Sequence, residues 1–218
     1  MALKLAFIHT SHVLIPLFTQ LSKDYLPGVE TFHMTDESLI RNTITAGRLT
    51  KSTTRRVAGM IGLAREGGAD VVMLTCSSIG PAVPVAREQF EFPILRIDEA
   101  MADAAVRSGN RIGVAATLRT TLEPTIALLR DIGAGAKRDV EILPELCDGA
   151  FEAVLSGDTA RHDELVSAAI RNLASRADVV VLAQASMARV LARMDLSKGA
   201  PVLSSPELAM KSARALFS

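Results

Sequence analysis

The chain has 218 residues, of which 49% are hydrophobic, and its 24 Lys and Arg side chains balance 24 Asp and Glu. This balance argues against a general attraction to nucleic acid or an anionic membrane, and one Tyr with no Trp argues against stacking on bases. No apolar run approaches the ~20 residues that span a bilayer, and two cysteines do not make a disulfide framework. The sequence starts Met-Ala-Leu-Lys and runs directly into a predicted strand without a signal-peptide pattern, so we expect a cytoplasmic protein with a small-molecule partner.

The first half of the chain is predicted to alternate strands and helices. Strands are expected at 4–9, 29–34, 71–74 and 93–97, and helices at about 12–25, 37–46, 51–66 and 98–107. The helix 51–66 has its apolar residues on one stripe and ends at Gly67-Gly68, and Thr35 or Asp36 can cap the helix before it. The run Val71–Leu74 is typical of a buried parallel strand.

The second half repeats this alternation. Strands are expected at 111–116, 140–143, 179–182 and 201–203, and helices at about 118–132, 149–155, 159–174, 185–193 and 206–217. Residues 144–148 are predicted to be a loop or a helix start, with Asp158 and Ser205 as helix caps. The last helix could return to the first half.

Three segments of the first half recur in the second at nearly the same offset. The stretch that starts at Ala69-Asp70 recurs at Ala177-Asp178, an offset of 108, and Pro93-Ile94-Leu95 recurs at Pro201-Val202-Leu203 with the same offset. Lys4–Thr10 matches Arg111–Thr117 at an offset of 107. We therefore predict an α/β fold of two pseudo-symmetric parallel-sheet halves, residues 1–107 plus 205–218 and residues 108–204, with the active site in the cleft between them.

Polar side chains and one thiol follow four of the predicted strands. Open parallel sheets bind ligands outside the carboxyl ends of their strands, so these positions are the candidate site. Cys76 is the candidate nucleophile or acid/base, because a helix starting just after it would favour the thiolate. The candidate substrate-binding residues are His9, Ser11, Ser77, Ser78, Thr117, Leu118, Gln184, Ala185 and Ser186.

These residues resemble the aspartate/glutamate racemase superfamily, which includes amino-acid racemases, hydantoin racemases, maleate isomerases and arylmalonate decarboxylases. The resemblance covers essentially the whole chain and rests on Leu74–Ser78, on Arg111–Thr117 with the following Thr120-Thr121, and on Val179–Gln184. It implies a cofactor-independent enzyme, a small carboxylate substrate and a homo-oligomer. It also implies that Cys76 is the first of two facing cysteines, and that Ser77, Ser78, Thr117 and Leu118 hold the substrate carboxylate.

The sequence departs from the family pattern at the second cysteine, where Gln184 stands. An amide cannot take or return a proton at ordinary pH, which argues against two-base racemisation by paired cysteines. Cys147 falls in the register of Thr35-Asp36 and not of Cys76, although it could still reach the cleft. His9 or His12 could supply a second base.

Several reactions and one different function stay open. Cys76 could attack an unsaturated diacid, or it could protonate one face of an enolate after decarboxylation or ring opening, with Gln184 orienting the substrate. Alternatively, the chain is a carboxylate-binding or regulatory protein that has lost two-base catalysis.

Other polar clusters have simpler explanations. His33, Asp36 and Glu37 could line the mouth of the site, but capping explains Asp36 without any function. His162-Asp163-Glu164 is predicted to lie on the solvated face of a helix. No zinc-ligand spacing, phosphate loop or dinucleotide fingerprint is present, so we expect no metal or cofactor.

Overall fold

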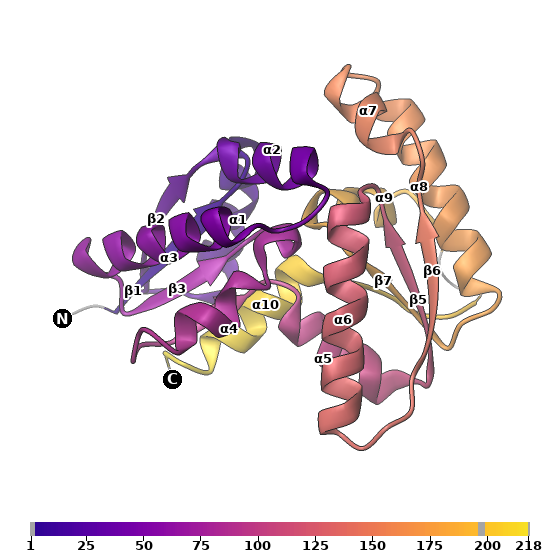
Figure 1. The fold of residues 1–218 in the computed structure, drawn as a ribbon. Helices are drawn as coiled ribbons and strands as arrows, with labels where there is room; N and C mark the ends of the chain where they lie inside the picture. Colours follow the sequence, from indigo (N-terminus) through magenta and orange to yellow (C-terminus); the bar gives the residue numbers. More distant parts are fainter. Residues whose placement is uncertain (1–2, 196–198, 218) are drawn as a thin grey trace. The chain divides into compact units, whose positions relative to one another are not determined.

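The computed structural model describes residues 3–195 and 199–217. The chain forms two compact units, each built around its own sheet. The first unit contains the chain up to Ile97 and from Pro206 onward, and the second is Asp98–Ser205. In Figure 1 the first unit runs from indigo to magenta and includes the yellow C-terminal helix.

The first unit has a parallel sheet in the order β2-β1-β3-β4. Its strands are β1 (Lys4–His9), β2 (Glu30–Thr35), β3 (Val71–Leu74) and β4 (Ile94–Arg96). Its helices are α1 (Ile15–Tyr25), α2 (Glu37–Ala46), α3 (Lys51–Glu66), α4 (Ala82–Arg87) and α10 (Ser205–Arg214), with short 3₁₀ turns at His12–Leu14 and Ser77–Ile79.

Helices cover both faces of this sheet, and the alternation of side chains along each strand decides which residues meet them. Ala6, Ile8, Val72 and Leu74 face one way and pack with buried residues of α2, α3 and α4. Leu5, Phe7, Val71 and Met73 face the other way and pack with α1 and with Ala209, Met210 and Ala213 of α10. The last helix is therefore part of the core of the first unit.

The second unit has a parallel sheet in the corresponding order β6-β5-β7-β8. Its strands are β5 (Arg111–Ala116), β6 (Glu141–Leu146), β7 (Val179–Leu182) and β8 (Val202–Ser204). Its helices are α5 (Glu99–Ser108), α6 (Arg119–Gly135), α7 (Ala150–Leu155), α8 (Thr159–Ala174) and α9 (Ala188–Leu191), with a 3₁₀ turn at Ala185–Met187. Figure 1 shows α6 and α8 on opposite sides of β5.

The α/β prediction with two parallel sheets is confirmed, and some local boundaries differ. The strand β6 continues through Pro144 to Leu146, whereas the sequence predicted a loop or a helix start there. β6 pairs only with β5 and forms the edge of its sheet, so a proline without an N–H is tolerated. Residues 98–107 were expected in the first half, but α5 packs against α6, β7 and β8 and belongs to the second unit.

The repeat in the sequence corresponds to matching contacts in the two units. The carboxylate of Asp70 accepts a hydrogen bond from the Lys4 N–H at 2.9 Å, and that of Asp178 accepts one from the Arg111 N–H at 2.8 Å. Each pair ties the start of a central strand to the loop before its neighbour. Among the described residues, no helix is long and apolar enough to cross a membrane.

Candidate functional site

Cys76 lies at the carboxyl end of β3, one residue before the 3₁₀ turn Ser77–Ile79, and is partly exposed. Its thiol forms hydrogen bonds with the Thr10 hydroxyl, the Ser78 hydroxyl and the backbone N–H groups of Ser78 and Ile79. These N–H groups are therefore directed at sulfur. Cys76 is itself the N-cap residue of this turn.

Two opposing effects act on the Cys76 thiol. Burial raises its pKa because a thiolate loses hydration there, and the four hydrogen bonds lower it by a smaller amount. The net pKa is raised, so the group is mainly a protonated thiol at neutral pH. Such a thiol is placed to donate a proton, and the same hydrogen bonds would stabilise the thiolate that remains.

His9 is fully buried below the strand ends and forms part of a chain of four side chains. The Thr75 hydroxyl donates to the Ile8 carbonyl at 3.1 Å, so it accepts from His9 Nδ1–H at 2.8 Å. His9 Nε2 then accepts from His33 Nδ1–H at 2.8 Å. The other His33 nitrogen, Nε2, accepts from the Thr19 hydroxyl at 3.1 Å.

Both histidines of this hydrogen-bonded row are neutral at pH 7. Burial, followed by the neighbouring His33, lowers the pKa of His9 to about 4, and burial lowers the pKa of His33. With both ring nitrogens engaged, His9 acts as a link between β1 and β3. It holds the residues that precede Thr10 and Cys76.

The pairing of His9 with His33 was not predicted, although the pattern contains a signal for it. Phe7 pairs with His33 across β1 and β2, and side chains two residues apart on a strand share a face. His9 therefore lies on the same face as His33, and the rings stack with centroids 5.1 Å apart.

The other first-unit candidates differ in exposure. Ser77 is buried, and Ser11 is partly exposed and makes no side-chain cap hydrogen bond. His12 is exposed, and its Nδ1 lies 2.6 Å from Glu37 Oε1. The loop after Cys76 also holds Gly80, where a Cβ atom would overlap the buried Arg96 side chain.

In the second unit, Gln184 and Thr117 form a closed pair. The Thr117 N–H donates to Gln184 Oε1 at 2.7 Å, and Gln184 Nε2 donates to Thr117 Oγ1 at 2.7 Å. The amide thus ties the end of β7 to the end of β5. Ala185 is buried in the following turn, and Ser186 is exposed.

The start of α6 offers a polar position that was not among the predicted site residues. Leu118 is the N-cap residue of α6, and its side chain makes no cap hydrogen bond. The buried Thr120 hydroxyl in this turn has no hydrogen-bond partner in the described part of the chain. Helix N-termini bind carboxylates through their backbone N–H groups. In the sequence, the threonine in the first turn of the helix was the only sign of this position.

Cys147 does not match Cys76 in position. It follows β6 on the edge strand, and its N–H donates to the Ala116 carbonyl, just as the Asp36 N–H donates to His9. Cys147 is buried, and burial with nearby Glu145 and Asp148 raises its pKa to about 12. Its thiol therefore stays protonated and enclosed.

His162 is buried, which corrects its predicted place on a solvated face, whereas Asp163 is partly buried and Glu164 is exposed as predicted. His162 is 2% exposed, and its Nδ1 lies 2.9 Å from Asp163 and 3.1 Å from Arg189 Nη2. Arg189 and Arg193 also pair with Asp163, at 2.7 and 3.3 Å. The cluster joins α8 to the region of α9, and a contact between helices cannot be predicted from the pattern of one helix.

No group of three His, Cys, Asp or Glu able to hold a metal occurs in residues 3–195 and 199–217.

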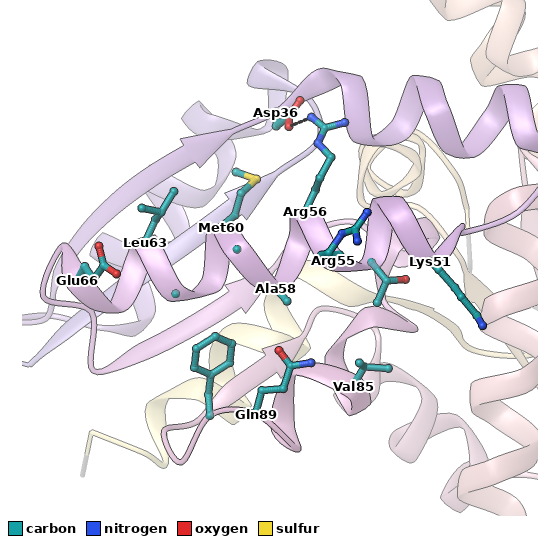
Figure 2. Close-up of a pocket in the computed structure, with 14 residues that line it drawn as sticks. Asp36, Lys51, Arg55, Arg56, Ala58, Met60, Leu63, Glu66, Val85 and Gln89 are labelled. Atoms are coloured by element: carbon teal, nitrogen blue, oxygen red, sulfur yellow. Dashed lines mark hydrogen bonds and ion pairs between the residues drawn. The ribbon is translucent and has the colours of Figure 1, made fainter.

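A groove of about 1030 Å³ lies elsewhere on the first unit, along the outer side of α3 (Figure 2). It is lined by residues of α3 and by Asp36, Val85, Gln89 and Phe90. Cys76 is not among its lining residues, so the groove is separate from the thiol site.

Comparisons with known proteins place this arrangement among related folds. The sequence profile described as Asp/Glu/Hydantoin racemase matches residues 9–213. Allantoin racemase from Klebsiella pneumoniae is similar in structure, with a TM-score of 0.73 and 20% identity, over 99% of this chain and 87% of that one. Glutamate racemase from Aquifex pyrophilus gives 0.70 and 16%, over 99% and 84%, and Picrophilus torridus aspartate racemase gives 0.69 and 15%, over 98% and 95%. A search of curated protein sequences found no match.

Proposed function

The chain belongs to the Asp/Glu/hydantoin racemase family, and from this premise we propose that it is a cofactor-independent racemase or isomerase acting beside the carboxylate of a small acid. Family membership supports a racemase-type enzyme. The finer assignment rests on Cys76, whose sulfur is surrounded by four hydrogen-bond partners at the end of a central strand. We also retain the cytoplasmic location expected from the sequence as part of this proposal.

In the proposed reaction, Cys76 is the acid/base or nucleophile. A proton next to a carboxylate is weakly acidic, so the thiol must be held in contact with the reacting carbon. Transfer of the S–H proton to an enolate-like carbon leaves a thiolate. Thr10, Ser78 and the Ile79 N–H would stabilise this thiolate, and the reverse step would remove a proton from the same carbon.

The substrate carboxylate is proposed to bind at polar strand ends. In the first unit these are Ser11, Ser77 and Ser78, and His9 acts through the position of its neighbours. In the second unit they are Thr117, Leu118, Ala185 and Ser186 with the newly recognised Thr120, whose hydroxyl has no protein partner among the described residues. Gln184 is proposed to position Thr117, because both its amide atoms already bond to that residue.

A second candidate is a carboxylate-binding or regulatory protein without turnover. The observation that favours it is the same Gln184–Thr117 pair, which places no titratable group at the position of the second cysteine. The two candidates differ in what loss of Cys76 does.

Solvent-exchange measurements on Cys76→Ala test the proposal. A thermal-shift screen of small mono- and dicarboxylates, with glutamate and aspartate included, identifies a ligand first. With that ligand in D₂O, we expect the wild-type protein to introduce deuterium beside the carboxylate and Cys76→Ala to lose this activity by ~1,000-fold or more.

Cys147→Ala is the matched control, because it removes the other thiol of the chain. It should retain exchange activity. Unchanged exchange in Cys76→Ala would refute the catalytic role of this residue, and ligand binding without any exchange in the wild type would favour the second candidate.

A further inference from the structure

The groove along α3 has an unusual arrangement of residues on the side of the helix that faces away from the sheet. The outer line of α3 consists of Arg55, Gly59, Gly62 and Glu66, at spacings of four, three and four residues. Such spacing places them on one face, opposite the buried Val57, Ile61 and Ala64. Figure 2 shows Arg55 and Glu66 near the two ends of the helix, with Gln89 and Val85 along one side.

The two glycines are not explained by packing within the unit. A Cβ atom at Gly59 would have no atom within 4 Å, and one at Gly62 would make only ordinary contact with Phe90 at 3.5 Å. Neither residue has a positive φ. Each glycine in a helix interior costs about 1 kcal/mol relative to alanine, so this pair weakens α3 without a local benefit. Glycines on an outer face allow another backbone to approach closely.

The charged ends of the outer line have no partner within the described chain. Arg56 pairs with Asp36, and Arg65 lies near Asp70 and over the ring of Phe92. The side chains of Arg55 and Glu66, in contrast, are exposed and take part in no ion pair or hydrogen bond among residues 3–195 and 199–217. They lie ~16 Å apart along the helix, too far to meet each other.

The outer line of one α3 is complementary in charge and shape to the outer line of a second α3 that runs in the opposite direction. Arg55 and Glu66 are centred on the point between Met60 and Ile61, and so are Gly59 and Gly62. A two-fold axis through that point would place Arg55 against Glu66 of a second copy at both ends of the contact, and Gly59 against Gly62 in the middle. A two-fold interface must be complementary to itself in this way.

We propose that a second copy of this chain occupies the groove, through antiparallel packing of α3 against its counterpart. Leu63 and Val85, which are 57% and 40% exposed, add apolar surface beside the line. The contact involves the first unit alone and does not depend on the reaction proposed for Cys76.

Charge reversal combined with sedimentation velocity tests this proposal on the full chain. The wild type should be a dimer at micromolar concentration. Arg55→Glu and Glu66→Arg should each weaken dimerisation by about tenfold or more, because each single change creates two like-charge contacts. The double variant Arg55→Glu/Glu66→Arg restores both opposite-charge contacts and should recover the dimer.

Two further variants separate the contact from folding. Arg171→Glu reverses an exposed charge on α8 and should leave association unchanged. Gly59→Leu fits the isolated unit, since space is open there, but it should block the close approach and give monomers with an intact circular-dichroism spectrum.

Three results would overturn the proposal. The first is a wild-type protein that stays monomeric at high concentration, which would indicate a different occupant of the groove. The second is a dimer that none of the α3 variants weakens. The third is failure of the double variant to recover association lost in the single variants.

Discussion

His9 makes the stability of the first unit depend on pH. Its pKa is about 4 in the folded protein and 6.5 when unperturbed, so the unfolded chain takes up a proton first as the pH falls. The stability contribution is complete above pH 6.5 and is lost between pH 6.5 and 4. The loss attributable to this residue should reach about 3 kcal/mol in urea-unfolding free energies.

His9→Asn provides the comparison, because asparagine can hydrogen-bond but does not titrate in this range. This variant should be less stable at pH 7, and its unfolding free energy should vary less between pH 6.5 and 4. An equal slope in variant and wild type would mean that other groups, His33 first among them, carry the pH dependence.

Thr120 gives a prediction in which stability and function change in opposite directions. Thr120→Val removes a buried hydroxyl that has no partner in the described residues, so the free energy of unfolding should stay equal or rise by about 1 kcal/mol. If the hydroxyl binds the substrate carboxylate, KM should rise severalfold at the same time.

Thr120→Ser is the control for this comparison, because it keeps the hydroxyl. Its KM should remain near that of the wild type. A Thr120→Val variant with normal KM in steady-state assays would remove this residue from the proposed binding site.

The sequence places several side chains at strand ends but does not give their hydrogen-bond partners. Cys76 could be recognised because an apolar strand ends at it, and its neighbours are small and polar. The hydrogen bonds between Gln184 and Thr117 join residues 67 positions apart in the sequence. The hydrogen bond between His9 and His33 joins two neighbouring strands. Such pairings depend on strand order and on rotamers, which local patterns do not specify.

The N-terminus of α8 provides a prediction for a single element. The Asp158 carboxylate accepts a hydrogen bond from the Arg161 N–H at 2.9 Å and so caps the helix. Asp158→Ala should lower the free energy of unfolding by about 1 kcal/mol. Asp158→Asn, which retains a side-chain oxygen, should cost clearly less in the same urea titration, and equal losses would contradict the capping role.

Helices with their own caps and stops were predicted well, and contacts between elements were not. The range Lys51–Glu66 agrees with α3 because its apolar stripe and glycine stop are local signals. The sequence predicts a loop or a helix start at Pro144, because the tolerance of a proline on an edge strand depends on strand order. His162 was placed toward solvent because α9, which covers that side of α8, lies more than twenty residues later.

On the scale of the whole molecule, the first unit is completed by the end of the chain. Met210 of α10 is fully buried among Leu5, Phe7 and Met73. Met210→Ala should cost about 2–4 kcal/mol, because it leaves a cavity in this core. Hydrogen exchange should show the loss of protection mainly in the first unit.

Leu216→Ala, at a residue that is 44% exposed, is the control and should have little effect. Loss of protection spread evenly over both units in Met210→Ala would show that the units unfold as one. Loss confined to the second unit would contradict the placement of α10.

The matching bonds of Asp70 and Asp178 have a consequence for how this fold can change over time. Each unit carries its own copy of the bonds that frame its sheet, including Lys4 with Glu30 and Arg111 with Glu141. The strand ends are not duplicated in this way, since Cys76 stands in one unit and Gln184 in the other. The framework bonds and the strand-end residues are therefore separable, and the residues at one sheet edge can change while both sheets keep their architecture.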